Sequence, residues 1–124
     1  MKLFTVSDAN ELLPLIVPKL QAIRFYYEKI GEMRDAARAA AGASQFGGGM
    51  EGGTDYVNML YLVGKLTTEL SDLGIELKDY ARGLIDFPSM RNQRIVLLCW
   101  QIGDGEEIGW WHETDAGFAG RQPL

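Results

Sequence analysis

The side chains with the greatest capacity for chemistry gather in the last stretch of the chain, "GWWHETDAGFAGRQPL" at residues 109–124. This stretch contains the only histidine of the protein, two of its three tryptophans, two carboxylates and an arginine. The candidate ligand-binding residues are His112, Glu113, Asp115, Arg121 and Trp110.

A histidine that lies beside carboxylates can act as a general base or bind a divalent metal ion. His112, Glu113 and Asp115 are the metal ligands that this stretch offers, and Asp79 or Asp86 from neighbouring strands could join them. The alternative is that His112 closes the edge of a sheet and hydrogen-bonds a carboxylate. A structural zinc site of the usual Cys/His type is excluded within one chain, which has one histidine and one cysteine.

Side chains alternate along a strand, so Trp110 and His112 share one face of the predicted strand and Glu113 lies on the other. The glycines of the tail allow it to fold back across the histidine. We therefore expect Arg121 close to His112, paired with Glu113 or Asp115 or holding an anionic ligand. A surface salt bridge of little energetic weight is the alternative.

Two helices are predicted to precede this stretch. "SDANELL" is typical of a helix start, with Ser7 or Asp8 as the cap, and Pro14 and Pro18 predict a bend or a delayed start. Apolar residues then recur alternately three and four positions apart, which is the spacing of a coiled-coil seam. The first seam comprises Leu13, Ile16, Leu20, Ile23, Tyr27 and Ile30, and the second comprises Tyr56, Met59, Val63, Leu66, Leu70 and Leu73. We expect a coiled-coil-like antiparallel hairpin over about 8–73, with a flexible glycine-rich tip at 42–53.

The second half, residues 75–124, changes to strand patterns. "IELKDY" alternates, "GLIDFPS" is predicted to end at Pro88, "QRIVLLCWQI" is typical of a buried central strand, and "EIGWWHE" follows the turn residues "GDGE". "LFTV" near the N-terminus is a candidate edge strand, and Cys99 is predicted to be an inert core thiol. The first helix overhangs the second, and its apolar overhang needs this sheet as cover. The predicted class is α+β: one domain over 1–124, with a small three- to four-stranded antiparallel β-meander on the hairpin.

Composition excludes several classes of partner. The chain has 12 basic and 17 acidic residues and a net charge of −5, so a nucleic-acid partner is not expected. The longest strongly apolar run, "IVLLCW", is far shorter than a membrane span, so no membrane partner is expected. A single cysteine and the lack of a signal-peptide core predict a cytoplasmic protein.

Three motifs carry a resemblance that covers nearly the whole chain: the "LIDFP" turn, the "LCW" strand and the "WHE-x-DAGFAGR" tail. In these motifs the sequence resembles a bacterial and archaeal family catalogued as family 2203 of the domains of unknown function. The resemblance implies a single-domain cytoplasmic protein and no particular chemistry. It places the hallmark residues of the family on His112, Glu113, Asp115 and Arg121.

Two hypotheses of function follow from the sequence. The first is a self-associating interaction or regulatory module, with a homodimer favoured, because Phe25, Tyr26 and Tyr27 give the first helix apolar surface beyond its seam. The second is an enzyme that depends on a small ligand or a divalent metal. Its site would lie at the junction of sheet and hairpin around His112, Glu113, Asp115 and Arg121.

Overall fold

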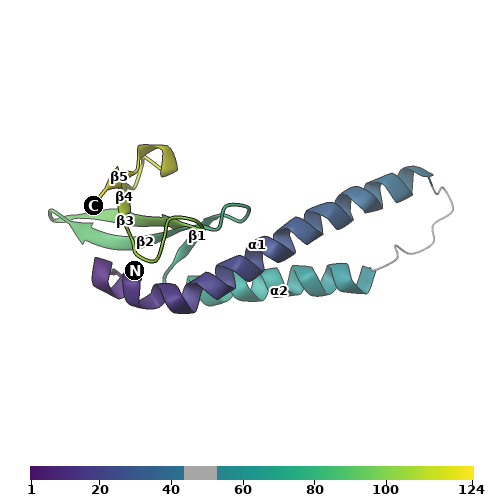
Figure 1. Ribbon diagram of the computed structural model, residues 1–124, viewed down its shortest axis with the longest axis horizontal. Helices are drawn as coiled ribbons and strands as arrows, with labels where there is room; N and C mark the ends of the chain where they lie inside the picture. Colours follow the sequence, from purple (N-terminus) through teal and green to yellow (C-terminus); the bar gives the residue numbers. More distant parts are fainter. Residues whose placement is uncertain (44–52) are drawn as a thin grey trace.

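The structure is a computed structural model that describes residues 1–43 and 53–124. Two long helices lie side by side, and a small sheet covers one end of the longer helix (Figure 1). The glycine-rich tip that the sequence predicts at 42–53 therefore lies mostly outside the described residues. Its first two positions belong to the first helix and its last position begins the second.

Helix α1 (Val6–Ala43) begins with a capping box in which Thr5 is the cap and Asp8 its partner, so the prediction of Ser7 or Asp8 as the cap was wrong. The Thr5 hydroxyl accepts the backbone N–H of Asp8, and the Asp8 carboxylate accepts the N–H of Thr5, each at 3.0 Å. Pro14 and Pro18 both lie inside the helix, so the delayed start was a wrong prediction. Both prolines are exposed, where water can satisfy the carbonyls that lose their intrahelical partner.

Helix α2 (Gly53–Asp72) ends in a Schellman motif at Gly74. Gly74 has φ of 91°, and the N–H groups of Gly74 and Ile75 bond to the carbonyls of Ser71 and Leu70. The turn satisfies the last carbonyls of α2 and leads the chain directly into the sheet.

The coiled-coil part of the prediction is only partly matched. Most of the predicted seam of α1 is buried, but Tyr27 is 43% exposed and stacks on Tyr80, beside the sheet, with ring centroids 5.4 Å apart. Leu70 is the one buried member of the α2 seam, and its other members are half-buried. Two helices alone cannot enclose a seam on all sides, so the hairpin is an open pair.

The sheet has five antiparallel strands in the order β1-β2-β3-β4-β5, one more than the largest number predicted. The additional strand comes from the tail, where the glycines let the chain return so that Gln122 and Pro123 pair with Trp111 and Trp110. The expected "LFTV" strand does not form, and its Phe4 N–H instead donates a bond to the Pro88 carbonyl at 2.7 Å. The strands are β1 (Glu76–Asp79), β2 (Leu84–Arg91), β3 (Arg94–Gln101), β4 (Trp110–Glu113) and β5 (Gln122–Pro123).

Strand β2 runs through Pro88, where the sequence predicted its end. β1 pairs only with residues 84–86 of β2, so Pro88 lies on a free edge where no ladder hydrogen bond is lost. A tight hairpin at Asn92 and Gln93, with φ of 51° and 65°, then joins β2 to β3.

The main core lies between one face of the sheet and α1. Alternate residues of the central strands point to this face and pack against the N-terminal half of α1, the start of which extends beyond the end of α2 (Figure 1). A hydrogen bond also joins the two halves, since the Ile108 backbone N–H donates to the Asn10 side-chain oxygen at 2.7 Å. The core residues from the sheet are Ile85, Phe87, Val96, Leu98, Trp100 and Trp111, and those from α1 are Ala9, Leu13, Ile16, Leu20 and Ile23.

Candidate functional site

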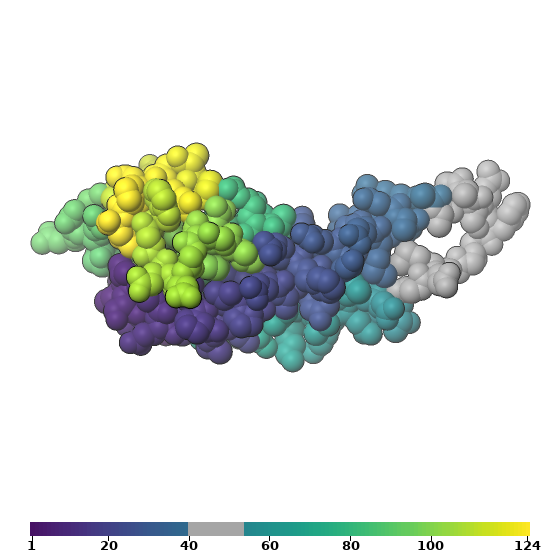
Figure 2. All heavy atoms as spheres, viewed as in Figure 1, coloured from purple at the N-terminus to yellow at the C-terminus, as the bar shows by residue number. Residues whose placement is uncertain are grey.

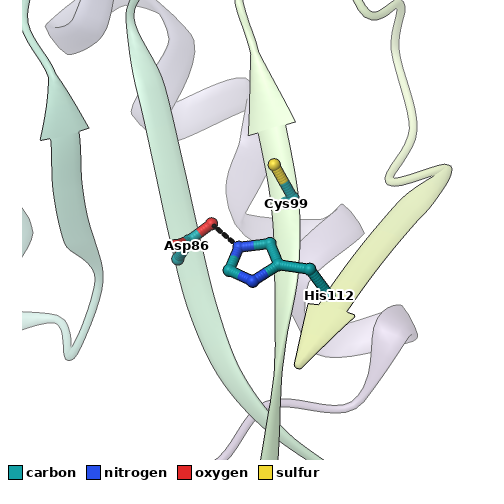
Figure 3. A group of neighbouring side chains, drawn as sticks. All are labelled: Asp86, Cys99 and His112. Carbon is teal, nitrogen blue, oxygen red and sulfur yellow. Dashed lines mark hydrogen bonds and ion pairs between the residues drawn. The ribbon is translucent and has the colours of Figure 1, made fainter. Parts of the chain in front are cut away.

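Three polar side chains from three adjacent strands meet on the face of the sheet that points away from α1. Asp86 comes from β2, Cys99 from β3 and His112 from β4, and they point toward one another (Figure 3). One ligand atom from each residue lies within 4.8 Å of the other two. We call these three residues the polar cluster.

The strand register explains why the three side chains meet. Asp86 lies directly opposite Cys99, and His112 lies opposite Leu97, two residues before Cys99 on the same face. β2 and β4 are not neighbours, so the His112 ring reaches over β3 to the carboxylate of Asp86. Phe87, one position along from Asp86, points to the opposite face and joins the helix-facing core.

The polar cluster is closed to solvent. Asp86 and His112 are each 2% exposed, and Cys99 is completely buried. The C-terminal tail, which includes the short 3-10 helix η1 (Phe118–Gly120), brings Arg121 near the Cys99 thiol. The guanidinium of Arg121 lies 4.4 Å from the ring centre of Trp110, which shares a face with Cys99 and His112.

The hydrogen bonds of His112 fix the position of one proton. Its Nδ1 lies 2.7 Å from the backbone carbonyl of Glu113, which only accepts, so Nδ1 carries hydrogen and donates. Its Nε2 lies 3.1 Å from Oδ1 of Asp86. This second contact is attractive only when one proton lies between the two atoms, either on the imidazole or on the carboxyl. Asp86 and His112 therefore share a single proton.

Burial governs the ionisation of the cluster. It raises the pKa of the Asp86 carboxyl, and the nearby His112 opposes that rise without cancelling it. Burial, together with the charge of Asp86, also raises the pKa of the Cys99 thiol to about 11. Cys99 is therefore a neutral thiol at neutral pH and is not an activated nucleophile.

The structure places the other predicted site residues around the cluster and not in it. The Glu113 carboxylate forms an ion pair with Arg94, and Asp115 is exposed in the turn after β4. Arg121 lies near the Cys99 thiol but pairs with Asp104 at 2.8 Å, where the sequence favoured Glu113 or Asp115. His112, Trp110 and Arg121 are thus brought to one face.

The sequence alone does not predict two members of the cluster as its central residues. It indicates Asp86 only as an additional ligand and Cys99 only as a core thiol. Register is the signal that unites them: once β2 and β3 are joined by the tight turn at Asn92 and Gln93, Asp86 must lie opposite Cys99. Each member also belongs to one of the three motifs that carry the family resemblance.

A second candidate site is the outer part of the hairpin, most of which extends beyond the sheet and which we call the arm (residues 24–39 of α1 and 54–66 of α2) (Figures 1 and 2). Val57, Leu60 and Tyr61 of α2 are 62%, 45% and 68% exposed. Tyr61 and Leu60 line a shallow groove that continues along α2. The other lining residues are Gly64, Lys65, Thr68 and Glu69.

The interior of the arm is also incompletely covered. Among its described residues, Ile30 is the only side chain of the arm that is buried, at 3% exposed. Met33, Tyr56, Met59 and Val63 all remain half-buried. The arm therefore exposes apolar surface both along the seam and on the outer side of α2.

Fold and site together define a class of protein with a helical hairpin mounted on a five-stranded antiparallel meander. The chain belongs to the family described as uncharacterized conserved protein (DUF2203), whose model matches residues 2–124. Neither a curated protein nor a solved structure matches the chain. In the described part of the chain, neither helix combines the length and the apolar character that a bilayer span requires.

Proposed function

We propose that the protein is a self-associating module whose arms pack against each other in a homodimer. The observation that carries this proposal is the incomplete interior of the arm, where Ile30 alone is buried among the described residues. Helical pairs of this kind are commonly completed by further helices into a four-helix bundle, and a second copy supplies two.

A second copy suits the surface of the arm for two reasons. Gly64 lies in the groove of α2, and nothing lies within 4 Å of the position that a Cβ would take there, so a partner helix can approach closely. The groove has Lys65 and Glu69 in its lining, and Glu69 is already paired with Lys19, so little unpaired negative charge faces a two-fold related copy. An isologous dimer would cover the same apolar side chains on both chains.

The alternative suggested by the sequence, an enzyme around His112, Glu113, Asp115 and Arg121, has less support. Glu113 pairs with Arg94 and Asp115 is exposed, so neither carboxylate accompanies His112 in a pocket. We accordingly favour an interaction or regulatory role in the cytoplasm, which the acidic composition and the single cysteine support.

Sedimentation equilibrium over a range of protein concentrations tests the proposal. We expect a reversible dimer in the wild-type protein and a monomer for Tyr61→Glu, since the charge would lie in the centre of the apolar interface. Met90→Glu is the matched control, because Met90 is 53% exposed on the sheet and outside the arm. A wild-type protein that remains monomeric at all concentrations, or equal effects of the two variants, would refute the proposal.

A further inference from the structure

The polar cluster contains three different kinds of metal-binding atom: a carboxylate oxygen, a thiol sulfur and an imidazole nitrogen. They lie on adjacent strands within 4.8 Å of one another. From this arrangement we infer that Asp86, Cys99 and His112 bind one divalent transition-metal ion, with zinc as the best-suited ion. The inference does not depend on self-association, because all three residues belong to the sheet of one chain.

The spacing of the ligand atoms suits a tetrahedral ion. Zinc binds nitrogen and oxygen at about 2.0–2.2 Å and sulfur at about 2.3 Å, which puts ligand atoms about 3.3–3.8 Å apart. Nε2 of His112 and Oδ1 of Asp86 are already 3.1 Å apart, and no pair in the cluster exceeds 4.8 Å. Side-chain rotations that move the ligand atoms together by about 1 Å would reach this spacing while the strands stay in place.

The orientation of His112 also suits a metal ligand. Its Nδ1–H donates to the Glu113 carbonyl, which fixes the ring and directs the Nε2 atom at Asp86, on the strand next to Cys99. Metal-bound histidines almost always have such an outer partner, which sets the tautomer and strengthens the ligand nitrogen.

Charge balance explains why a buried site would prefer this kind of ion. A carboxylate, a thiolate and a neutral imidazole carry two negative charges, which a divalent ion neutralises. A neutral site avoids the large cost of placing net charge in a buried environment. Sulfur and nitrogen ligands favour zinc and similar ions over magnesium or calcium, which prefer oxygen.

Arg121 of the C-terminal tail lies near the cluster, on the face of the sheet that carries it. Arg121 pairs with Asp104, stacks on Trp110 and lies near the Cys99 thiol, so it holds the tail over this face. Three protein ligands leave a tetrahedral ion one position for water or a small ligand. Loosening of the tail would give access to that position.

Titration of the purified protein with Co²⁺ tests the site directly, because a cobalt–thiolate bond gives a charge-transfer absorption band. We expect saturation at one equivalent of Co²⁺ per chain, with displacement of the cobalt spectrum by Zn²⁺. Absence of stoichiometric binding by the wild-type protein would overturn the inference, whatever the variants do.

Variants identify the ligands. Cys99→Ser should abolish the charge-transfer band and weaken metal affinity by at least about 100-fold, more than the loss of an outer partner typically costs. Asp86→Asn should weaken affinity similarly while the thiolate band persists at high cobalt concentration. Circular dichroism establishes that each variant is folded before it is titrated.

Glu113→Gln is the matched control, because Glu113 follows His112 directly but its carboxylate pairs with Arg94. Its backbone carbonyl, the partner of Nδ1, is retained. We expect its cobalt affinity to equal that of the wild type. A loss of binding in Glu113→Gln together with retention in Cys99→Ser would place the metal outside the polar cluster and refute the proposed ligand set.

Discussion

The arm and the polar cluster differ in which side chains they expose to solvent. In the arm, apolar side chains such as Val57 and Tyr61 are largely exposed to solvent. In the cluster, a carboxyl, an imidazole and a thiol are buried, and no buried side-chain nitrogen or oxygen in the described part of the chain lacks a hydrogen-bond partner. Each region departs from the usual rule that apolar groups are buried and ionisable groups exposed.

The two departures have different consequences. Exposed apolar surface costs free energy that a partner can recover, which is why we propose the arm as the site of self-association. A buried ionisable group costs free energy that only internal partners or an ion can offset. We therefore propose assembly for the arm and binding of a metal ion for the cluster. The predictions below test this division.

The largest effect should come from breaking the buried pair. His112→Ala leaves the Asp86 carboxyl buried without its partner, and we expect the free energy of unfolding to fall by about 3–5 kcal/mol. Urea denaturation measures this change. The double variant His112→Ala/Asp86→Ala should lose less than the sum of the two single changes, and strictly additive losses would show that the two side chains do not interact.

The free energy of unfolding, measured as a function of pH, should show the effect of the raised pKa of the buried Cys99 thiol. Because the pKa of Cys99 is raised from 9.0 to about 11 in the folded, metal-free protein, the stability that the protonated thiol contributes is fully present below pH 9 and is lost as the pH rises through 11. We expect the wild type to lose roughly 2–3 kcal/mol more than Cys99→Ala over this interval. Parallel pH profiles of the two proteins would contradict the burial of the thiol.

Arg121, which we expect to cover the cluster, should contribute moderately to the free energy of unfolding. Arg121 is 15% and Asp104 is 9% exposed in their side chains, and the guanidinium also lies over Trp110 and Phe118. We expect Arg121→Ala to cost about 1–3 kcal/mol. It should also make Cys99 react faster with a thiol reagent in the folded protein. Unchanged reactivity would mean that the tail does not cover the cluster.

The smallest effect concerns the helical glycines. Gly64 and Gly31 have open space around the position of a Cβ, so alanine at either position should stabilise the monomer by about 0.5–1 kcal/mol. Thermal unfolding at low protein concentration measures both gains. In the dimer, Gly64→Ala should weaken association because it narrows the groove. Destabilisation of the monomer by Gly64→Ala would show that the groove is already filled within one chain.

The sequence predicted the helices and the central strands better than the short strand that completes the sheet. The spacing of apolar residues identified both helices and the start of the sheet, because these features depend on local pattern. It also indicated that the sheet covers one end of α1. The fifth strand depends on a return of the tail over β4, and two residues such as Gln122 and Pro123 carry no strand pattern of their own. Tertiary pairing decides such short strands.

The candidate site shows the same limit. His112 stood out because it is unique, and its neighbours Glu113 and Asp115 were the ligands nearest in sequence. Its partner in space, Asp86, lies two strands away; the sequence offered it only beside Asp79, and the register decides between the two. In a strand, the residue next to a histidine points to the opposite face, so proximity in sequence was a poor guide to the ligands.

Hydrogen–deuterium exchange at low and high protein concentration tests the division between the two regions most directly. If the arm is completed by a second copy, its amides should exchange about tenfold or more slowly at high concentration, while those of β2, β3 and β4 around the cluster keep their rates. Exchange in the arm that is independent of concentration, or a slowing that is confined to the sheet, would contradict the account.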